Sequence, residues 1–154
     1  SGCLIFDNLS DDGDVQRQIR SMYIRANTLV RKFGRCSKEA KVQLFAAYLG
    51  NAYCSQLWTN VSSSQMQKLK VAYNNSFRIF FGLPRICSIS NMFVHHGIPT
   101  YGEFTRREIY SFWRRIEYSN NLIVQNIAGN WQHFMQLFTF KYWQRALFMT
   151  SAVT

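Results

Sequence analysis

Prolines and glycines are scarce in this sequence, with 2 and 8 among 154 residues. Their scarcity argues against a turn-rich all-β sandwich, which needs such residues at its many tight turns. No apolar run approaches the roughly 18 residues that cross a bilayer, so we expect no transmembrane helix and no membrane partner. We also expect no signal peptide. Because 47% of the residues are hydrophobic, the chain can still bury a core, which excludes disorder throughout.

Acidic residues are few and unevenly placed. The chain has 18 Lys and Arg residues against 8 Asp and Glu, a net charge of +10. Four of the acids, Asp7, Asp11, Asp12 and Asp14, fall in the first 14 residues, which contain no base. Residues 15–154 therefore carry all 18 bases and only four acids. Such a charge favours a polyanionic partner, and nucleic acid above all, over the alternative of a merely solubilising surface.

Cysteine spacing gives no sign of a metal or redox motif. None of Cys3, Cys36, Cys54 and Cys87 forms a C-x-x-C pair, which excludes a zinc ribbon and a thioredoxin-type site. We expect reduced, mostly buried thiols in an intracellular protein, nuclear or cytoplasmic. The adjacent His95 and His96 are a weak metal candidate, so no metal and no cofactor is predicted.

Hydrophobic periodicity predicts an all-α fold, a compact bundle of five to seven helices with a short N-terminal extended segment. The first helix should run from Val15 to about Gly34, with Asp14 as its N-cap. Further helices are expected over residues 37–58, 62–82, 88–96, 100–118 and 120–127. Capping boxes at Ser62–Gln65 and Thr100–Glu103 mark two of the starts, while Gly82 and Gly97 mark two of the ends. Residues 130–150 are aromatic-rich, without clean periodicity, and are also predicted to be helical.

The first predicted helix carries a stripe of arginines opposite its apolar face. Arg17, Arg20, Arg31 and Arg35 project within a narrow arc and span about 27 Å at 1.5 Å per residue. No acid occurs between Val15 and Cys36. The stripe is therefore predicted to follow the phosphates of a nucleic acid, and an ordinary solvated face is the alternative.

The helix after Thr100 has a similar but rougher pattern. Arg106, Arg107 and Arg114 share the side opposite its apolar face with Tyr110 and Trp113. Aromatic rings interleaved with arginines suit stacking on nucleotides, and they equally suit a second buried contact. Arg115, on the apolar side, is expected to be buried or partly paired.

Residues for catalysis are lacking. After Asp14 the only acids are Glu39, Glu103, Glu108 and Glu117, and two of these are explained as helix-start residues. There is no glycine-rich phosphate loop and no oriented Cys–His pair. The acidic cluster near Asp11 lacks the spacing of a calcium loop. We therefore expect no enzyme activity from this chain on its own.

Several phrases of the sequence together resemble a known family. They are GCLIFDNLSDDGD (2–14), IRSMYIRANTL (19–29), RKF (31–33), KVQLF (41–45), LW (57–58), KLKVAYNN (68–75), FRI (77–79) and RIEYSNN (115–121). The set resembles the end of the palm, the thumb and the region after it in non-LTR (LINE-type) retrotransposon reverse transcriptases. Gly2 matches the glycine of a Tyr-Leu-Gly-type motif, whereas Ser1 replaces its leucine and its tyrosine is absent.

The resemblance implies a role in gripping the template–primer duplex. The family's metal-binding aspartates lie upstream of this segment, and no residue here matches a catalytic residue of the family. Residues 1–14 would end the palm, 15–128 would form the helical thumb and post-thumb domain, and 129–154 would be an aromatic C-terminal segment. Expected partners are the backbone of an RNA or DNA duplex or hybrid, and the missing palm. The alternatives are a protein-interaction module derived from a retrotransposon and, less favoured, a free-standing enzyme.

Overall fold

The structure is a computed structural model that describes residues 11–49, 58 and 61–129. Within this part of the chain there are six α-helices and no β-strand, which confirms the predicted all-α bundle. The helices are α1 (Asp12–Phe33), α2 (Lys38–Leu49), α3 (Ser63–Phe81), α4 (Ile89–His96), α5 (Tyr101–Glu117) and α6 (Leu122–Ala128). The predicted N-terminal extended segment and the helix predicted over residues 130–150 lie outside the described residues.

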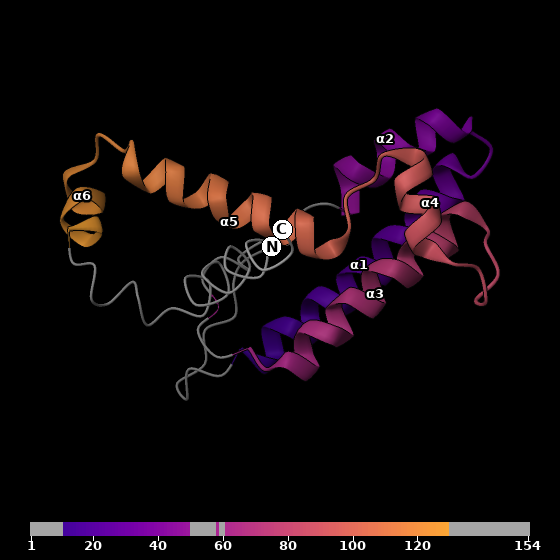
Figure 1. Cartoon of the computed structure of the whole chain (residues 1–154), viewed down its shortest axis with the longest axis horizontal. Helices are drawn as coiled ribbons and strands as arrows, with labels where there is room; N and C mark the ends of the chain where they lie inside the picture. Colours follow the sequence, from indigo (N-terminus) through magenta and orange to yellow (C-terminus); the bar gives the residue numbers. More distant parts are fainter. Residues whose placement is uncertain (1–10, 50–57, 59–60, 130–154) are drawn as a thin grey trace, which may run out of the picture.

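Helices α1 and α3 lie side by side along their length and form the main packing pair (Figure 1). They run in the same direction, because Trp58, just before α3, meets Asp14 in the first turn of α1. Midway along the pair, the Asn75 amide of α3 donates to the Tyr23 hydroxyl of α1 at 3.3 Å. Helix α2 packs against both helices.

Aromatic rings from four helices fill the centre of the core. Phe45 of α2 meets Phe77 of α3 edge to face, with ring centroids 5.2 Å apart. Phe93 of α4 contacts Phe77 at 5.0 Å, and Phe104 of α5 stacks on Tyr73 of α3 at 6.5 Å. Such pairs contribute about 0.5–1.5 kcal/mol beyond the area they bury. The aromatic centre therefore joins α2, α3, α4 and the start of α5 into one body.

The predicted start and stop signals are confirmed at α3, α4 and α5. Ser62 and Thr100 each accept a hydrogen bond from a backbone N–H of the first turn, and Gln65 and Glu103 each bond back to the cap residue. Gly82 and Gly97 end α3 and α4 with φ of +68° and +61°. Only glycine adopts this left-handed conformation without strain, so these two residues fix where the chain turns.

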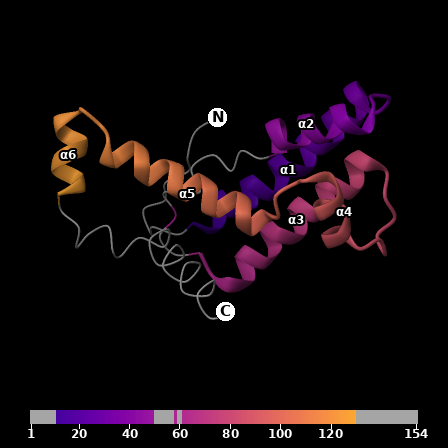
Figure 2. The same ribbon diagram turned by 45° about the horizontal axis from the view of Figure 1, so that its top comes forward.

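Helix α5 begins in the core and then leads away from α1–α4 to α6, which Figure 1 and Figure 2 show from two directions. Tyr101 and Phe104 are buried, and the Tyr73 hydroxyl donates to the Pro99 carbonyl at 3.0 Å. Burial raises the pKa of Tyr73, so its hydroxyl stays a protonated donor. The second half of α5 is less enclosed, since Phe112 and Ile116 are only half-buried.

Several predicted boundaries need correction. Asp14 is not the N-cap of α1: the helix starts one turn earlier, with Asp11 at the cap position, and Asp14 is buried inside the first turn. Helix α2 is described only as far as Leu49, and Trp58, its predicted end, is not helical. Helix α6 begins at Leu122 because the Asn121 side chain accepts from the N–H of Ile123 at 2.9 Å.

The cysteines differ from the expectation of mostly buried thiols. Cys36 is exposed in the turn after α1, and Cys87 is half-buried, both as free thiols. Cys3 and Cys54 lie outside the described residues. No helix in the described ranges is both long and apolar enough to span a bilayer.

Candidate nucleic-acid interface

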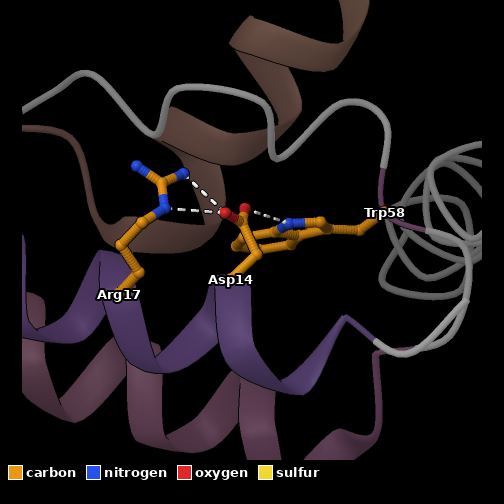
Figure 3. A network of polar contacts seen from close by, with 3 residues as sticks. All are labelled: Asp14, Arg17 and Trp58. Carbon is orange, nitrogen blue, oxygen red and sulfur yellow. Dashed lines mark hydrogen bonds and ion pairs between the residues drawn. The ribbon is translucent and has the colours of Figure 1, made fainter. Parts of the chain in front are cut away.

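Asp14 is the centre of a buried polar cluster at the start of α1 (Figure 3). It is 2% exposed, and its Oδ1 accepts from Arg17 Nε at 2.8 Å and pairs with the same guanidinium at 2.6 Å. Its Oδ2 accepts from Trp58 Nε1 at 2.9 Å. Both carboxylate oxygens are thus used, which holds the chain before α3 against the first turn of α1.

This cluster removes one member from the predicted arginine stripe of α1. Arg17 is half-buried and turned to Asp14, so its guanidinium is committed to the fold. Arg35 is exposed, but it follows the end of α1 at Phe33 and so leaves the helical phase of the stripe. Arg20 and Arg31 remain exposed on the helix, about 16 Å apart at 1.5 Å per residue. The stripe is therefore shorter than predicted.

Helix α3 extends the remaining basic surface sideways. Arg20, Asn27 and Arg31 lie three, four and eight residues from Tyr23, the α1 residue whose hydroxyl meets Asn75. Residues at these spacings share one side of a helix. Lys68 precedes Asn75 by two helical turns and shares its side of α3. We call the surface formed by Arg20, Asn27, Arg31, Lys68 and Asn75 the α1–α3 face.

The α1–α3 face is open and contains no acidic residue. Arg20, Asn27, Arg31 and Lys68 are exposed, and Asn75 is half-buried. Within the described ranges none of the three basic groups forms an ion pair. Helix α3 has no Asp or Glu, and α1 has none after Asp14. Such a surface presents positive charge beside the exposed Asn27 amide, the combination that contacts phosphate and sugar oxygens.

Two further arginines that no sequence signal marked are structural. Arg25 Nη1 donates to the Tyr48 carbonyl at 3.2 Å and ties α1 to α2. Arg78 Nη1 donates to Asn75 Oδ1 at 3.1 Å, and its Nη2 donates to the Cys87 carbonyl at 3.2 Å. Both side chains are half-buried. Their acceptors are uncharged backbone or amide oxygens, so charge counting alone cannot identify them.

On α5 the three predicted arginines separate into two environments. Arg106 is half-buried and its guanidinium lies close to Gly102. Arg107 is exposed, with its guanidinium 5.9 Å from the Phe104 ring, and Arg114 is exposed with its guanidinium 4.5 Å from the Tyr118 ring. The Trp113 side chain lies outside what the structure describes.

Arg115 was expected to be buried or partly paired, but it is exposed, and its Nε donates to the Ser111 carbonyl at 3.3 Å. Glu39 and Glu103 have the helix-start positions predicted for them. The pKa of Glu103 is lowered, first by the backbone N–H of Thr100 and then by its hydroxyl. Backbone hydrogen bonding at the start of α2, followed by Ser37, lowers the pKa of Glu39 in the same way. These two acids stabilise helix starts.

The described residues contain no group of three His, Cys, Asp or Glu side chains that could hold a metal ion. Comparison of the chain with protein-family models, with curated proteins and with solved structures gave no match.

Proposed function

We propose that this chain binds the backbone of a nucleic-acid duplex through the α1–α3 face. The observation that carries the proposal is the exposed set Arg20, Arg31 and Lys68 on two parallel helices, without an acid between them. Each phosphate contact of this kind releases counterions and adds sequence-independent affinity. The absence of a base-reading motif favours recognition by backbone and shape.

The proposal extends to the origin of the chain, on the resemblance of its sequence to non-LTR reverse transcriptases. Its role would be that of the thumb and the region after it, which grip the template–primer, and a palm domain would be its second partner. We propose no catalytic residue, because the paired carboxylates of a two-metal polymerase site would have to come from that palm. Primer extension with Mg²⁺ on a primed template should therefore give no product with this chain alone, and extension that Asp11→Ala and Asp12→Ala abolish would contradict this.

The duplex proposal is tested by reversing the charge of Arg20 and Arg31 together. Arg20→Glu with Arg31→Glu should lower the slope of log affinity against log salt by about 2, since each phosphate contact contributes about 0.9. Thermal stability should not change, because both side chains are exposed. Fluorescence anisotropy with a labelled duplex over a salt series gives the slope, and melting curves give the stability.

A matched control keeps the same change of net charge away from the α1–α3 face. Lys38 at the start of α2 and Arg85 in the loop after α3 are exposed. Lys38→Glu with Arg85→Glu should leave the slope near that of the parent. An equal decrease of the slope in both double variants would mean that binding depends only on the total charge of the protein. An unchanged slope in the Arg20/Arg31 variant would exclude the α1–α3 face as the duplex-binding surface.

A second candidate function, protein interaction, is favoured by two exposed apolar side chains. Ile86 in the loop after α3 is 95% exposed, and Val94 on α4 is 84% exposed. Neither belongs to the α1–α3 face. Such residues suit packing against a palm domain or another protein. Salt separates the two functions, because phosphate binding weakens steeply at high salt and an apolar interface does not.

A further inference from the structure

Helix α5 carries a second basic surface of a different chemical kind. Arg107, Tyr110 and Arg114 of α5 and its C-cap residue, Tyr118, follow one another at spacings of three, four and four residues, which places them along one side of the helix. All four are exposed, Tyr110 at 54% and Tyr118 at 65%. The row, which we call the α5 stripe, alternates guanidinium and phenol over about 16 Å.

The stripe faces away from the packed side of α5. Tyr101 and Ile109 are buried on the packed side, and Phe104, at the edge between the two sides, stacks on Tyr73 and meets the Arg107 guanidinium. The two tyrosines therefore do not contribute to the aromatic centre of the fold. Exposed aromatic side chains at regular spacing are typical of a surface that binds a partner, because contact with the partner removes their apolar area from water.

The arginines of the stripe are held by rings and not by carboxylates. Arg114 lies over Tyr118 and Arg107 over Phe104, and within the described residues neither forms an ion pair. Glu103 lies one turn before Arg107, but its carboxylate is bonded to the Thr100 N–H at 2.7 Å. Glu117 follows Arg114 by three residues without pairing with it. No carboxylate among the described residues therefore neutralises these two guanidinium groups, and both can attract an anionic ligand.

We propose that the α5 stripe binds single-stranded nucleic acid, with bases stacked on Tyr110 and Tyr118 and phosphates at Arg107 and Arg114. The proposal rests on the proposed function and adds a second site with its own ligand. A duplex hides the faces of its bases, whereas a single strand can lay them on aromatic rings. Arg107 and Arg114 are about 10 Å apart along the helix, roughly the length of three nucleotides of a stacked strand.

The test compares three probes of equal length with the whole chain: a labelled oligo-dT strand, an abasic strand that has phosphates but no bases, and a duplex. Base–aromatic stacking is strong enough to change affinity about tenfold per base. The parent protein should bind oligo-dT at least tenfold more tightly than the abasic strand. Tyr110→Ala with Tyr118→Ala should remove that preference and leave duplex affinity within about twofold.

Two further variants separate stacking from general damage. Tyr110→Phe with Tyr118→Phe keeps both rings and should retain the preference for oligo-dT. Tyr48→Ala removes a tyrosine of similar exposure (53%) on α2 and should change neither single-strand nor duplex binding. Thermal melts of all variants should coincide with that of the parent, because none of the three side chains is buried.

The outcomes distinguish this proposal from the duplex proposal. Equal binding of oligo-dT and abasic strand by a parent that still binds duplex would overturn the stacking site alone. So would an undiminished preference in the double alanine variant. Binding of neither strand nor duplex would overturn both proposals. A base preference that survives Arg20→Glu with Arg31→Glu, while duplex binding falls, would support two separate surfaces.

Discussion

Helices α1 and α5 look alike in sequence and differ in the fold. Each has one apolar side, an opposite side rich in arginine, and an acid in its first turn. Helix α1 packs along its length against α3, and its first-turn acid, Asp14, is buried between Arg17 and Trp58. In the described part of the chain, the start of α5 packs against α3, and its first-turn acid, Glu103, is exposed and bonded back to the cap residue Thr100. Similar residues therefore support tertiary packing in one helix and local structure in the other.

The arginines show the same difference. In α1, Arg17 is bonded to Asp14, the buried acid of its own first turn, and Arg25 is bonded to the Tyr48 carbonyl of α2. Arg20 and Arg31 remain exposed on the helix. In α5, the guanidinium groups of Arg107 and Arg114 lie, within the described residues, over the rings of Phe104 and of the C-cap residue Tyr118. A stripe of like charges on a helix is thus a set of candidates, from which tertiary contacts remove some members.

The largest loss of stability is expected in α5, where two substitutions compare the packed start of the helix with its more open end. Phe104→Ala removes a ring that is 2% exposed and stacked on Tyr73, and should destabilise the fold by about 3–5 kcal/mol. Ile116→Ala, in the half-buried second half, should cost about 1 kcal/mol or less. Urea unfolding followed by circular dichroism measures both, and equal losses would contradict the division of α5 into a packed start and an open end.

Asp14→Ala tests whether the start of α1 depends on its buried cluster. The change leaves the Trp58 N–H and the Arg17 guanidinium without their acceptor and should cost about 2–3 kcal/mol. The matched control is Asp12→Ala, an exposed acid of the same first turn, for which we expect less than about 1 kcal/mol. Similar melting temperatures for the two variants would show that helix-start charge, and not the cluster, is what matters.

Arg17→Glu and Arg20→Glu separate the structural from the free arginines of α1. Arg17→Glu places a second carboxylate beside buried Asp14 and should destabilise by about 1–2 kcal/mol. Arg20→Glu, on the exposed side, should change the free energy of unfolding by no more than about 0.5 kcal/mol. If Arg17→Glu melts like Arg20→Glu, Arg17 would belong with Arg20 and Arg31 among the free arginines of α1.

The local signals of the sequence were sufficient for most helix limits. Ser62–Gln65 and Thr100–Glu103 are short-range motifs, and Gly82 and Gly97 end their helices by backbone conformation alone, so each could be predicted from its neighbours. Asp14 could not, because its role depends on Trp58, 44 residues away. An aspartate at this position can serve either as an N-cap or in a buried polar cluster, and its tertiary partner decides which of the two roles it has.

The candidate site, too, could be predicted where it depends on local sequence and not where it depends on tertiary packing. Exposed Arg20, Arg31, Arg107 and Arg114 follow from helical phase, which needs only the apolar side of each helix. The contribution of Lys68 and Asn75 required the parallel packing of α1 and α3, which no sequence pattern indicated. The structural roles of Arg25 and Arg78 required carbonyl oxygens of neighbouring elements to be in place.

The smallest expected effect concerns pH and the two capping boxes. The box of α5 uses Glu103, whose pKa is lowered by the Thr100 N–H and hydroxyl, whereas the box of α3 uses the uncharged Gln65. A lowered folded-state pKa means that ionised Glu103 stabilises the fold above its unfolded pKa of about 4.3. This contribution is lost as the pH falls through the folded pKa. Since the carboxylate is exposed, it should be well below 1 kcal/mol.

Glu103→Gln gives α5 the same kind of box as α3 and removes the titrating group. The stability difference between parent and variant should be constant from about pH 7 to 5 and should shrink towards pH 3, as the parent carboxylate becomes protonated. Gln65→Glu is the reciprocal change and should introduce the same pH dependence at α3. Urea unfolding at each pH measures both differences. A stability difference between parent and Glu103→Gln that grows below pH 5 would contradict this prediction. It would mean that Glu103 stabilises the folded protein in its protonated form.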